Sequence, residues 1–79
     1  MMGEIEFKLE RHIATLSTSR TGITVELNIV TFADNPTKID LRRWKDGKPR
    51  KGISLTQEET ELLYRALGAL LEDNPKQIG

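Results

Sequence analysis

The sequence predicts an α+β domain in which an antiparallel sheet of four strands is followed by one C-terminal helix. Four segments before residue 56 place apolar residues at alternate positions, as half-buried strands do. Short turn signals separate these segments, and leucine and alanine recur at helical spacing after residue 56. A chain of 79 residues is enough for one domain, so we expect a single domain over residues 1–79.

The first strand is expected over residues 4–18. Apolar side chains alternate at its start, and the alternation reaches Ile13, but Leu16 breaks it. A long strand with such a slip in its alternation is typical of a β-bulge or a sharp bend. Residues 20–22, Arg-Thr-Gly, then supply the turn that ends the strand.

The second strand is expected over residues 23–32. One face is uniformly aliphatic, with Ile23, Val25, Leu27 and Ile29, and is the expected core face. The other face is mostly polar and ends in an aromatic ring, with Thr24, Glu26, Asn28, Val30 and Phe32. Residues 34–36, Asp-Asn-Pro, turn the chain.

The third strand begins at Lys38, and the fourth ends at Leu55. Asp46-Gly47 between them is a strong signal for a tight hairpin turn. By the period of two, the side chains that point to the core are Ile39, Leu41, Ile53 and Leu55. The side chains on the opposite, open face are Lys38, Asp40, Arg42, Trp44, Arg50, Gly52 and Ser54.

The helix is expected to begin at Thr56 and to end at Asn74-Pro75. Thr56 and Glu59 have the spacing of a capping box, in which each side chain accepts a hydrogen bond from the other's backbone amide. The apolar residues of this helix spread over roughly 200° of its circumference, about twice the arc that one buried face needs. We therefore expect a homodimer in which the second apolar face packs on the same helix of another copy, through Leu63, Leu67, Leu70 and Leu71. The alternative is a helix set deep in its own sheet.

Charge is unevenly distributed along the chain. Twelve Lys/Arg and twelve Asp/Glu give zero formal net charge, but residues 38–51 hold seven Lys/Arg and two acidic residues. Screening at physiological salt acts over about 8 Å, so this cationic segment attracts a polyanion despite the neutral total. There is no cysteine, no signal-peptide core, and no apolar run of the ~18 residues that a membrane span needs. We expect a cytoplasmic protein with no membrane partner.

We interpret the open face of the sheet as a surface for single-stranded nucleic acid. A tryptophan beside arginines and lysines on an open strand face is suited to stacking on bases while the cations contact phosphates. The expected binding residues are Phe32, Lys38, Arg42, Trp44, Lys45, Lys48, Arg50, Lys51 and Gly52. Stacking and phosphate contacts ignore the 2′-hydroxyl, so both DNA and RNA remain open as ligands.

Blander interpretations exist for the same residues. In one alternative, Trp44 and Phe32 belong to a minor core under the long first strand. In another, Arg42 pairs with Asp40. In a third alternative, the basic face as a whole binds an acidic protein partner, and the chain is a small protein-interaction module.

Catalysis is poorly supported. His12 is the single histidine and has no evident catalytic partner. The acidic residues at the expected helix start, Glu58, Glu59 and Glu61, suit the positive helix N-terminus. No phosphate-binding loop, zinc spacing or nucleophile elbow is present. We therefore expect no enzyme activity, no cofactor, no metal and no small-molecule substrate.

The run PRKGISLTQEE, preceded by KIDLRRW and a short turn, resembles the signature of the transcriptional coactivator positive cofactor four family. Its small bacterial members, the YdbC-type single-stranded-DNA-binding proteins, are similar over nearly the whole chain. The resemblance implies a strongly curved sheet, a homodimer packed through the helices, and single-stranded DNA bound across the concave face with little sequence preference. A role in transcription regulation or DNA maintenance would follow from it.

The resemblance also implies roles for particular residues. Arg42 matches the family's strand arginine, residues 50–52 match the loop before the fourth strand, and Phe32 matches the aromatic residue that ends the second strand. Trp44 stands where the family has a tyrosine followed by a tryptophan, so one aromatic residue is present in place of two.

Overall fold

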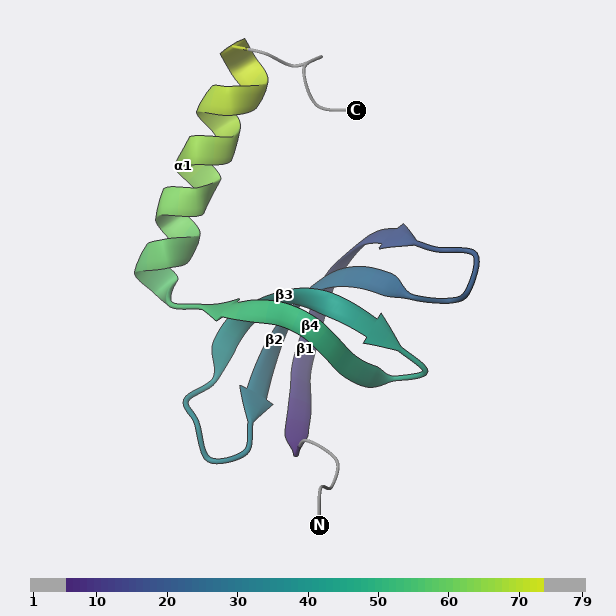
Figure 1. Cartoon of the computed structure of the whole chain (residues 1–79). Helices are drawn as coiled ribbons and strands as arrows, with labels where there is room; N and C mark the ends of the chain where they lie inside the picture. Colours follow the sequence, from purple (N-terminus) through teal and green to yellow (C-terminus); the bar gives the residue numbers. More distant parts are fainter. Residues whose placement is uncertain (1–5, 74–79) are drawn as a thin grey trace.

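The computed structural model describes residues 6–73 and contains one antiparallel sheet followed by one helix (Figure 1). The strands lie side by side in the order of the sequence, β1-β2-β3-β4. This confirms the predicted fold class. The bounds of the elements are β1 Phe7–Thr18, β2 Thr24–Phe32, β3 Lys38–Lys45, β4 Lys48–Leu55 and α1 Gln57–Asp73.

Strand β1 is irregular, as the slip in its alternation predicts. Its register against β2 shifts between Leu9 and Arg11, between His12 and Ala14, and between Thr15 and Ser17. Each shift places an extra residue on β1, and such bulges bend a strand and increase its twist. The long first strand therefore curves across the sheet.

The sheet is strongly curled. Phe7 pairs with Phe32 at the end of β2, whereas Trp44 pairs with Thr24 at its beginning. In a flat sheet these two positions would be roughly 25 Å apart at the usual rise of a strand. The rings of Phe7 and Trp44 nevertheless lie only 5.4 Å apart between their centroids. The face that carries both rings is therefore the inner, concave face of the curl.

The register between β2 and β3 confirms the predicted division of side chains between two faces. The concave face carries Thr24, Glu26, Asn28, Val30 and Phe32 of β2 opposite Lys38, Asp40, Arg42 and Trp44 of β3. The other face, called here the aliphatic face, carries Val25, Leu27, Ile29, Ile39, Leu41, Ile53 and Leu55.

Burial within one chain differs from the prediction. The aliphatic face is the expected core, yet its side chains are only half-buried and Ile53 is 55% exposed. Among the described residues, the buried ones are all on the concave face: Asn28, Val30, Asp40 and Trp44. The curl brings side chains of the concave face into contact with one another and so buries them. The aliphatic face stays uncovered because α1 extends away from the sheet (Figure 1).

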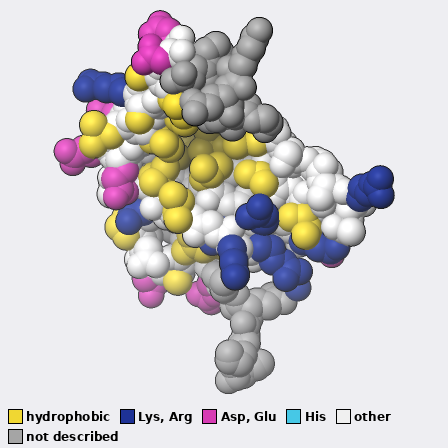
Figure 2. Space-filling model, turned by 45° about the horizontal axis from the view of Figure 1, so that its top comes forward, with side chains coloured by type: hydrophobic (Ala, Val, Ile, Leu, Met, Phe, Trp, Pro, Cys, Tyr) yellow, Lys and Arg dark blue, Asp and Glu magenta, His cyan; other side chains and the backbone are white. Residues whose placement is uncertain are grey.

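Helix α1 contributes no buried residue within its described length. Leu62, Leu67 and Leu71 are 57%, 46% and 51% exposed. Figure 2 shows hydrophobic side chains gathered in one broad area on the side of the molecule from which α1 projects. No helix within residues 6–73 has the length and hydropathy that crossing a bilayer requires.

The local signals for turns and for the helix start are confirmed. Asp46 and Gly47 have φ angles of 54° and 75°, the left-handed pair of a tight hairpin turn. The Glu59 amide donates to Thr56 Oγ1 at 3.1 Å, and the Thr56 amide donates to Glu59 Oε1 at 2.8 Å. Thr56 is thus the cap, and the helix itself begins one residue later. Residues 74–75, where we expect the helix to end, lie outside the described residues.

Candidate nucleic-acid interface

Three of the chain's four aromatic side chains gather on the concave face. The ring of Phe7 lies 6.3 Å from that of Phe32 and meets Trp44 edge-on at 5.4 Å. The Arg42 guanidinium lies over the Phe32 ring, 4.7 Å from its centroid. Phe7, Phe32, Trp44 and Arg42 are called here the ring cluster. Cations and rings thus share one surface, which is the arrangement that stacking on nucleic acid uses.

The prediction that Trp44 is a solvent-facing platform is wrong. Trp44 lies on the predicted face but is only 5% exposed. Phe7 covers it from β1 because the curl brings the start of β1 over the end of β3. The alternative of a minor-core tryptophan under the first strand is the correct one. The rings that stay half-buried, and therefore partly accessible to a base, are Phe7 and Phe32.

Arg42 is held in place by a buried carboxylate. Its Nε donates to Asp40 Oδ2 at 2.6 Å, and its Nη2 donates to Asp40 Oδ1 at 2.7 Å. Its Nη1 donates to the carbonyl of Arg50 at 3.1 Å. Asp40 is fully buried and also accepts from the hydroxyl of Ser54 at 2.9 Å. The alternative interpretation, in which Arg42 pairs with Asp40, is therefore confirmed, and the pair holds the guanidinium over the Phe32 ring.

The remaining predicted cations are distributed around the hairpin of β3 and β4. Lys38 lies on the concave face and lines a hollow of about 270 Å³ beside Phe32. Lys45 is half-buried, and its Nζ donates to the carbonyl of Thr21 at 2.8 Å. The exposed cations of the hairpin include Lys48, Arg50 and Lys51. Their contact with nucleic acid stays a prediction.

Gly52 has a structural reason to be glycine. It pairs with Arg42 across β3 and β4. A Cβ atom at Gly52 would lie 1.9 Å from Arg42 Cβ and 2.5 Å from the carbonyl oxygen of Leu41. The missing side chain lets β4 approach β3 closely enough for the Arg50 carbonyl to accept from Arg42.

A hydrogen-bonded row of polar side chains runs along the concave face. His12 Nδ1 donates to Asn28 Oδ1 at 2.6 Å, and Asn28 Nδ2 donates to Glu26 Oε1 at 3.1 Å. Thr24 donates to Glu26 Oε2 at 2.5 Å. Burial raises the pKa of Glu26, but the hydrogen bonds from Thr24 and Asn28 and the charge of His12 outweigh it and lower the pKa below its usual value. Glu26 is therefore an ionised acceptor at neutral pH.

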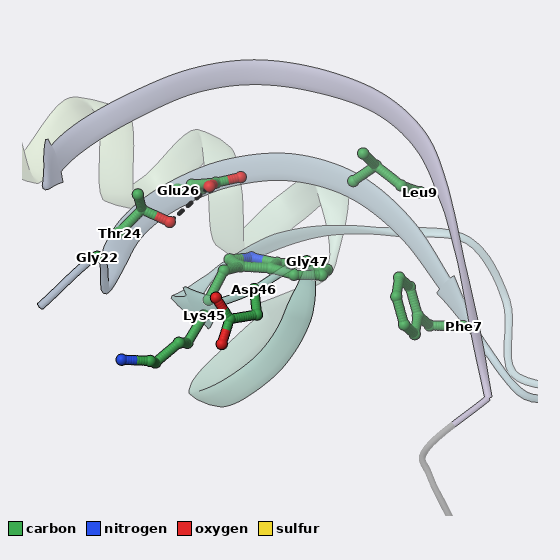
Figure 3. Close-up of a pocket in the computed structure, with 9 residues that line it drawn as sticks. Phe7, Leu9, Gly22, Thr24, Glu26, Lys45, Asp46 and Gly47 are labelled. Carbon is green, nitrogen blue, oxygen red and sulfur yellow. Dashed lines mark hydrogen bonds between the residues drawn. The ribbon is translucent and has the colours of Figure 1, made fainter.

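A cavity of about 320 Å³ opens on the concave face next to the ring cluster (Figure 3). Its walls come from the start of β1, the start of β2 with the turn before it, and the end of β3 with the turn after it. The lining residues are Phe7, Leu9, Gly22, Thr24, Glu26, Trp44, Lys45, Asp46 and Gly47. Within residues 6–73, no group of three or more acidic or histidine side chains is placed to hold a metal ion.

Sequence reasoning missed Phe7, Asp40 and the cavity. The alternation identifies Phe7 as an inward residue of the first strand, but its partners depend on a register that three bulges shift. Asp40 is visible only as a possible partner of Arg42. The cavity exists because the curl brings residues of β1 against the turn after β3, and no local pattern encodes that approach.

No family model matches the chain. An uncharacterized protein of Treponema pallidum (strain Nichols) is similar to it, with 32% identity over 72 residues. The alignment covers 89% of this chain and 85% of the relative, so the two proteins share nearly their whole length.

Proposed function

We propose that this chain, which belongs to the same family as the uncharacterized Treponema pallidum protein, binds single-stranded nucleic acid across the concave face of its sheet. The observation that carries the proposal is the ring cluster, in which two half-buried rings and a fixed guanidinium share one surface. The resemblance to the positive cofactor four family supports single-stranded DNA as the first ligand to test.

In this proposal, bases stack on Phe32 and Phe7 while cations contact the phosphates. Base–aromatic stacking contributes about 1–3 kcal/mol per base and tolerates any sequence. The hollow beside Phe32 is lined by Lys38, so one stacked base and one neutralised phosphate fit at the same place. Arg50 and Lys51, which are exposed near the hairpin turn, would contact further phosphates.

A single strand is the better ligand than a duplex. The bases of a duplex are stacked on one another and cannot reach rings inside a curled sheet. Duplex recognition commonly places a helix in the major groove. Helix α1 is acidic in its first turn, with Glu58 and Glu59, and has no basic residue in its last turn. It is therefore unsuited to a phosphate-lined groove.

We expect fluorescence anisotropy with labelled oligo-dT to show binding that exceeds binding to the matched duplex and weakens steeply with salt. Arg50→Ala should weaken binding and flatten the log–log salt slope by roughly 0.7, the increment for one phosphate on a single strand. Arg65→Ala on α1 is the matched control and should leave both quantities unchanged. Equal affinity for duplex and single strand, or affinity independent of salt, would contradict the proposal. Oligo-U in the same titration compares RNA with DNA.

The proposed binding unit is a homodimer. Ile53 on the aliphatic face and Leu67 and Leu71 on α1 are each about half exposed in one chain. A continuous apolar area of this kind on a monomer is an aggregation liability, and a second copy of the same chain would cover it. Leu63 and Leu70 lie on the same side of α1 as Leu67 and belong to the proposed interface.

Sedimentation at micromolar concentration is expected to give the mass of a dimer. Leu67→Glu should shift the protein to the monomer mass, because it places a charge in the apolar interface. Arg65→Glu introduces the same charge on the opposite, polar side of α1 and should stay dimeric. A wild-type protein that sediments as a monomer would refute the proposed interface.

A further inference from the structure

The cavity of about 320 Å³ beside the ring cluster has the chemistry of a binding pocket for one nucleobase. Its volume is near the lower end of the range for small-molecule sites, which begins at about 300 Å³. In Figure 3, Phe7 and Leu9 lie on one side of this space, and Glu26 of β2, Lys45 at the end of β3 and Asp46 in the turn after it border the other. An apolar wall and a polar wall thus face the same space.

The polar wall selects hydrogen-bond donors. Glu26 and Asp46 line the cavity against one cation, Lys45, so the net negative charge of its wall disfavours a phosphate. Glu26 already accepts one hydrogen bond on each oxygen, from Thr24 and Asn28, and each oxygen keeps further acceptor capacity. On a surface that binds nucleic acid, a carboxylate can contribute to binding by accepting hydrogen bonds from the N–H groups of a base edge.

Trp44 also lines this cavity and carries an indole N–H, at Nε1, that is buried and has no partner among the described residues. A buried indole N–H ordinarily has a partner. Because Nε1 is buried, a ligand in this cavity can reach it only after a neighbouring side chain moves, and the Phe7 ring, which meets Trp44 edge-on, is the side chain whose movement the proposal requires. The pocket thus combines a donor that lacks an acceptor with a carboxylate that accepts.

We propose that this cavity binds guanine. On its Watson–Crick edge guanine carries the O6 acceptor, the N1–H donor and the N2 amino group in a row, and it alone among the bases offers two adjacent donors. O6 would accept from Trp44 Nε1, N1–H and the N2 amino group would donate to Glu26, and the ring would pack on Phe7. The inference rests on the proposed function: it adds one base-selective position to an otherwise sequence-tolerant surface.

The test compares oligo-dT with the same oligonucleotide carrying one central dG, one central deoxyinosine or one central dA. We expect the dG oligonucleotide to bind about tenfold more tightly than oligo-dT, in the range of one good bidentate base contact. Inosine keeps O6 and N1–H but lacks the N2 amino group, so it should lose most of the gain. Glu26→Gln should bring the dG oligonucleotide down to the affinity of oligo-dT, whereas Glu61→Gln on α1 should change neither affinity.

The possible outcomes distinguish failure of the guanine pocket from failure of the proposed single-strand binding. Binding of oligo-dT without any gain from dG would overturn the guanine pocket and leave the proposed function standing. Equal binding of dG and inosine would also overturn it, because the N2 contact to Glu26 would be absent. Failure of every oligonucleotide to bind would overturn the proposed function and the pocket together. The inosine arm uses the unaltered protein, so it is independent of how Glu26→Gln folds.

Discussion

Replacement of Trp44 by alanine is expected to lower the free energy of unfolding by about 3–5 kcal/mol. Trp44 is one of two buried apolar side chains among the described residues, and Phe7 packs against it from the far end of the curl. Its removal would leave a cavity and release the contact that holds the start of β1 over the end of β3. Small domains have a total stability of about 5–15 kcal/mol, so this loss approaches global unfolding.

Urea denaturation followed by circular dichroism measures this loss, since the variant has no tryptophan to report by fluorescence. Trp44→Phe keeps a ring at the position and should cost less. Tyr64→Ala is the control for removing an aromatic side chain, because Tyr64 is 79% exposed on α1 and should change stability by no more than about 0.5 kcal/mol. A loss below about 1 kcal/mol for Trp44→Ala would mean that this ring is not part of the core.

The second large effect is expected at Asp40. Its carboxylate is fully buried and holds Arg42, whose side chain is only 14% exposed. Asp40→Ala would leave that guanidinium without its charge partner and remove the acceptor for Ser54. Breaking a buried ion pair from one side typically costs about 3–5 kcal/mol, and we expect a loss in that range in the same urea titration.

A double variant distinguishes an unpaired charge from a general packing defect. Replacing both members, with Asp40→Leu and Arg42→Met, removes the buried charges together and should recover much of the lost stability. If the double variant is as unstable as Asp40→Ala, the loss comes from packing and not from the uncompensated guanidinium. If Asp40→Ala is as stable as the wild type, the pair does not organise the concave face.

Local chemistry made much of the fold predictable. The alternation in β2 and β3 assigns each side chain to the correct face, because register there is regular and the period is two. Asp46-Gly47 and the Thr56–Glu59 capping box depend only on residues close in sequence, and both are present as predicted. Even the slip at Leu16 correctly signals the irregularity of β1.

The burial of the two faces was not predictable in the same way. Whether a strand position is buried depends on how far the sheet curls and on where the helix goes, and both are properties of distant segments. The alternation of β3 assigns Trp44 to the open face. It is buried nevertheless, because the three bulges bend β1 so that it covers Trp44. The alternation of β4 assigns Ile53 to the core face. It is 55% exposed nevertheless, because α1 extends away from the sheet.

The candidate site was predictable in composition and not in geometry. The cationic segment, and the face that Phe32 shares with Lys38 and Arg42, follow from the sequence. The contact of Arg42 with Phe32, the fully buried Asp40 and the cavity near Glu26 do not, since each joins residues through the curvature of the sheet. The rings that a base can reach are therefore those of Phe7 and Phe32, and not that of Trp44.

The most direct test of the proposed concave-face surface is nuclear magnetic resonance of the side chains during titration with oligo-dT. We expect the ring signals of Phe7 and Phe32 and the indole N–H signal of Trp44 to shift as the oligonucleotide is added. The methyl signals of Leu27 and Ile53, on the aliphatic face, should stay in place. Shifts confined to those methyl groups, with unchanged ring and indole signals, would contradict a nucleic-acid surface on the concave face.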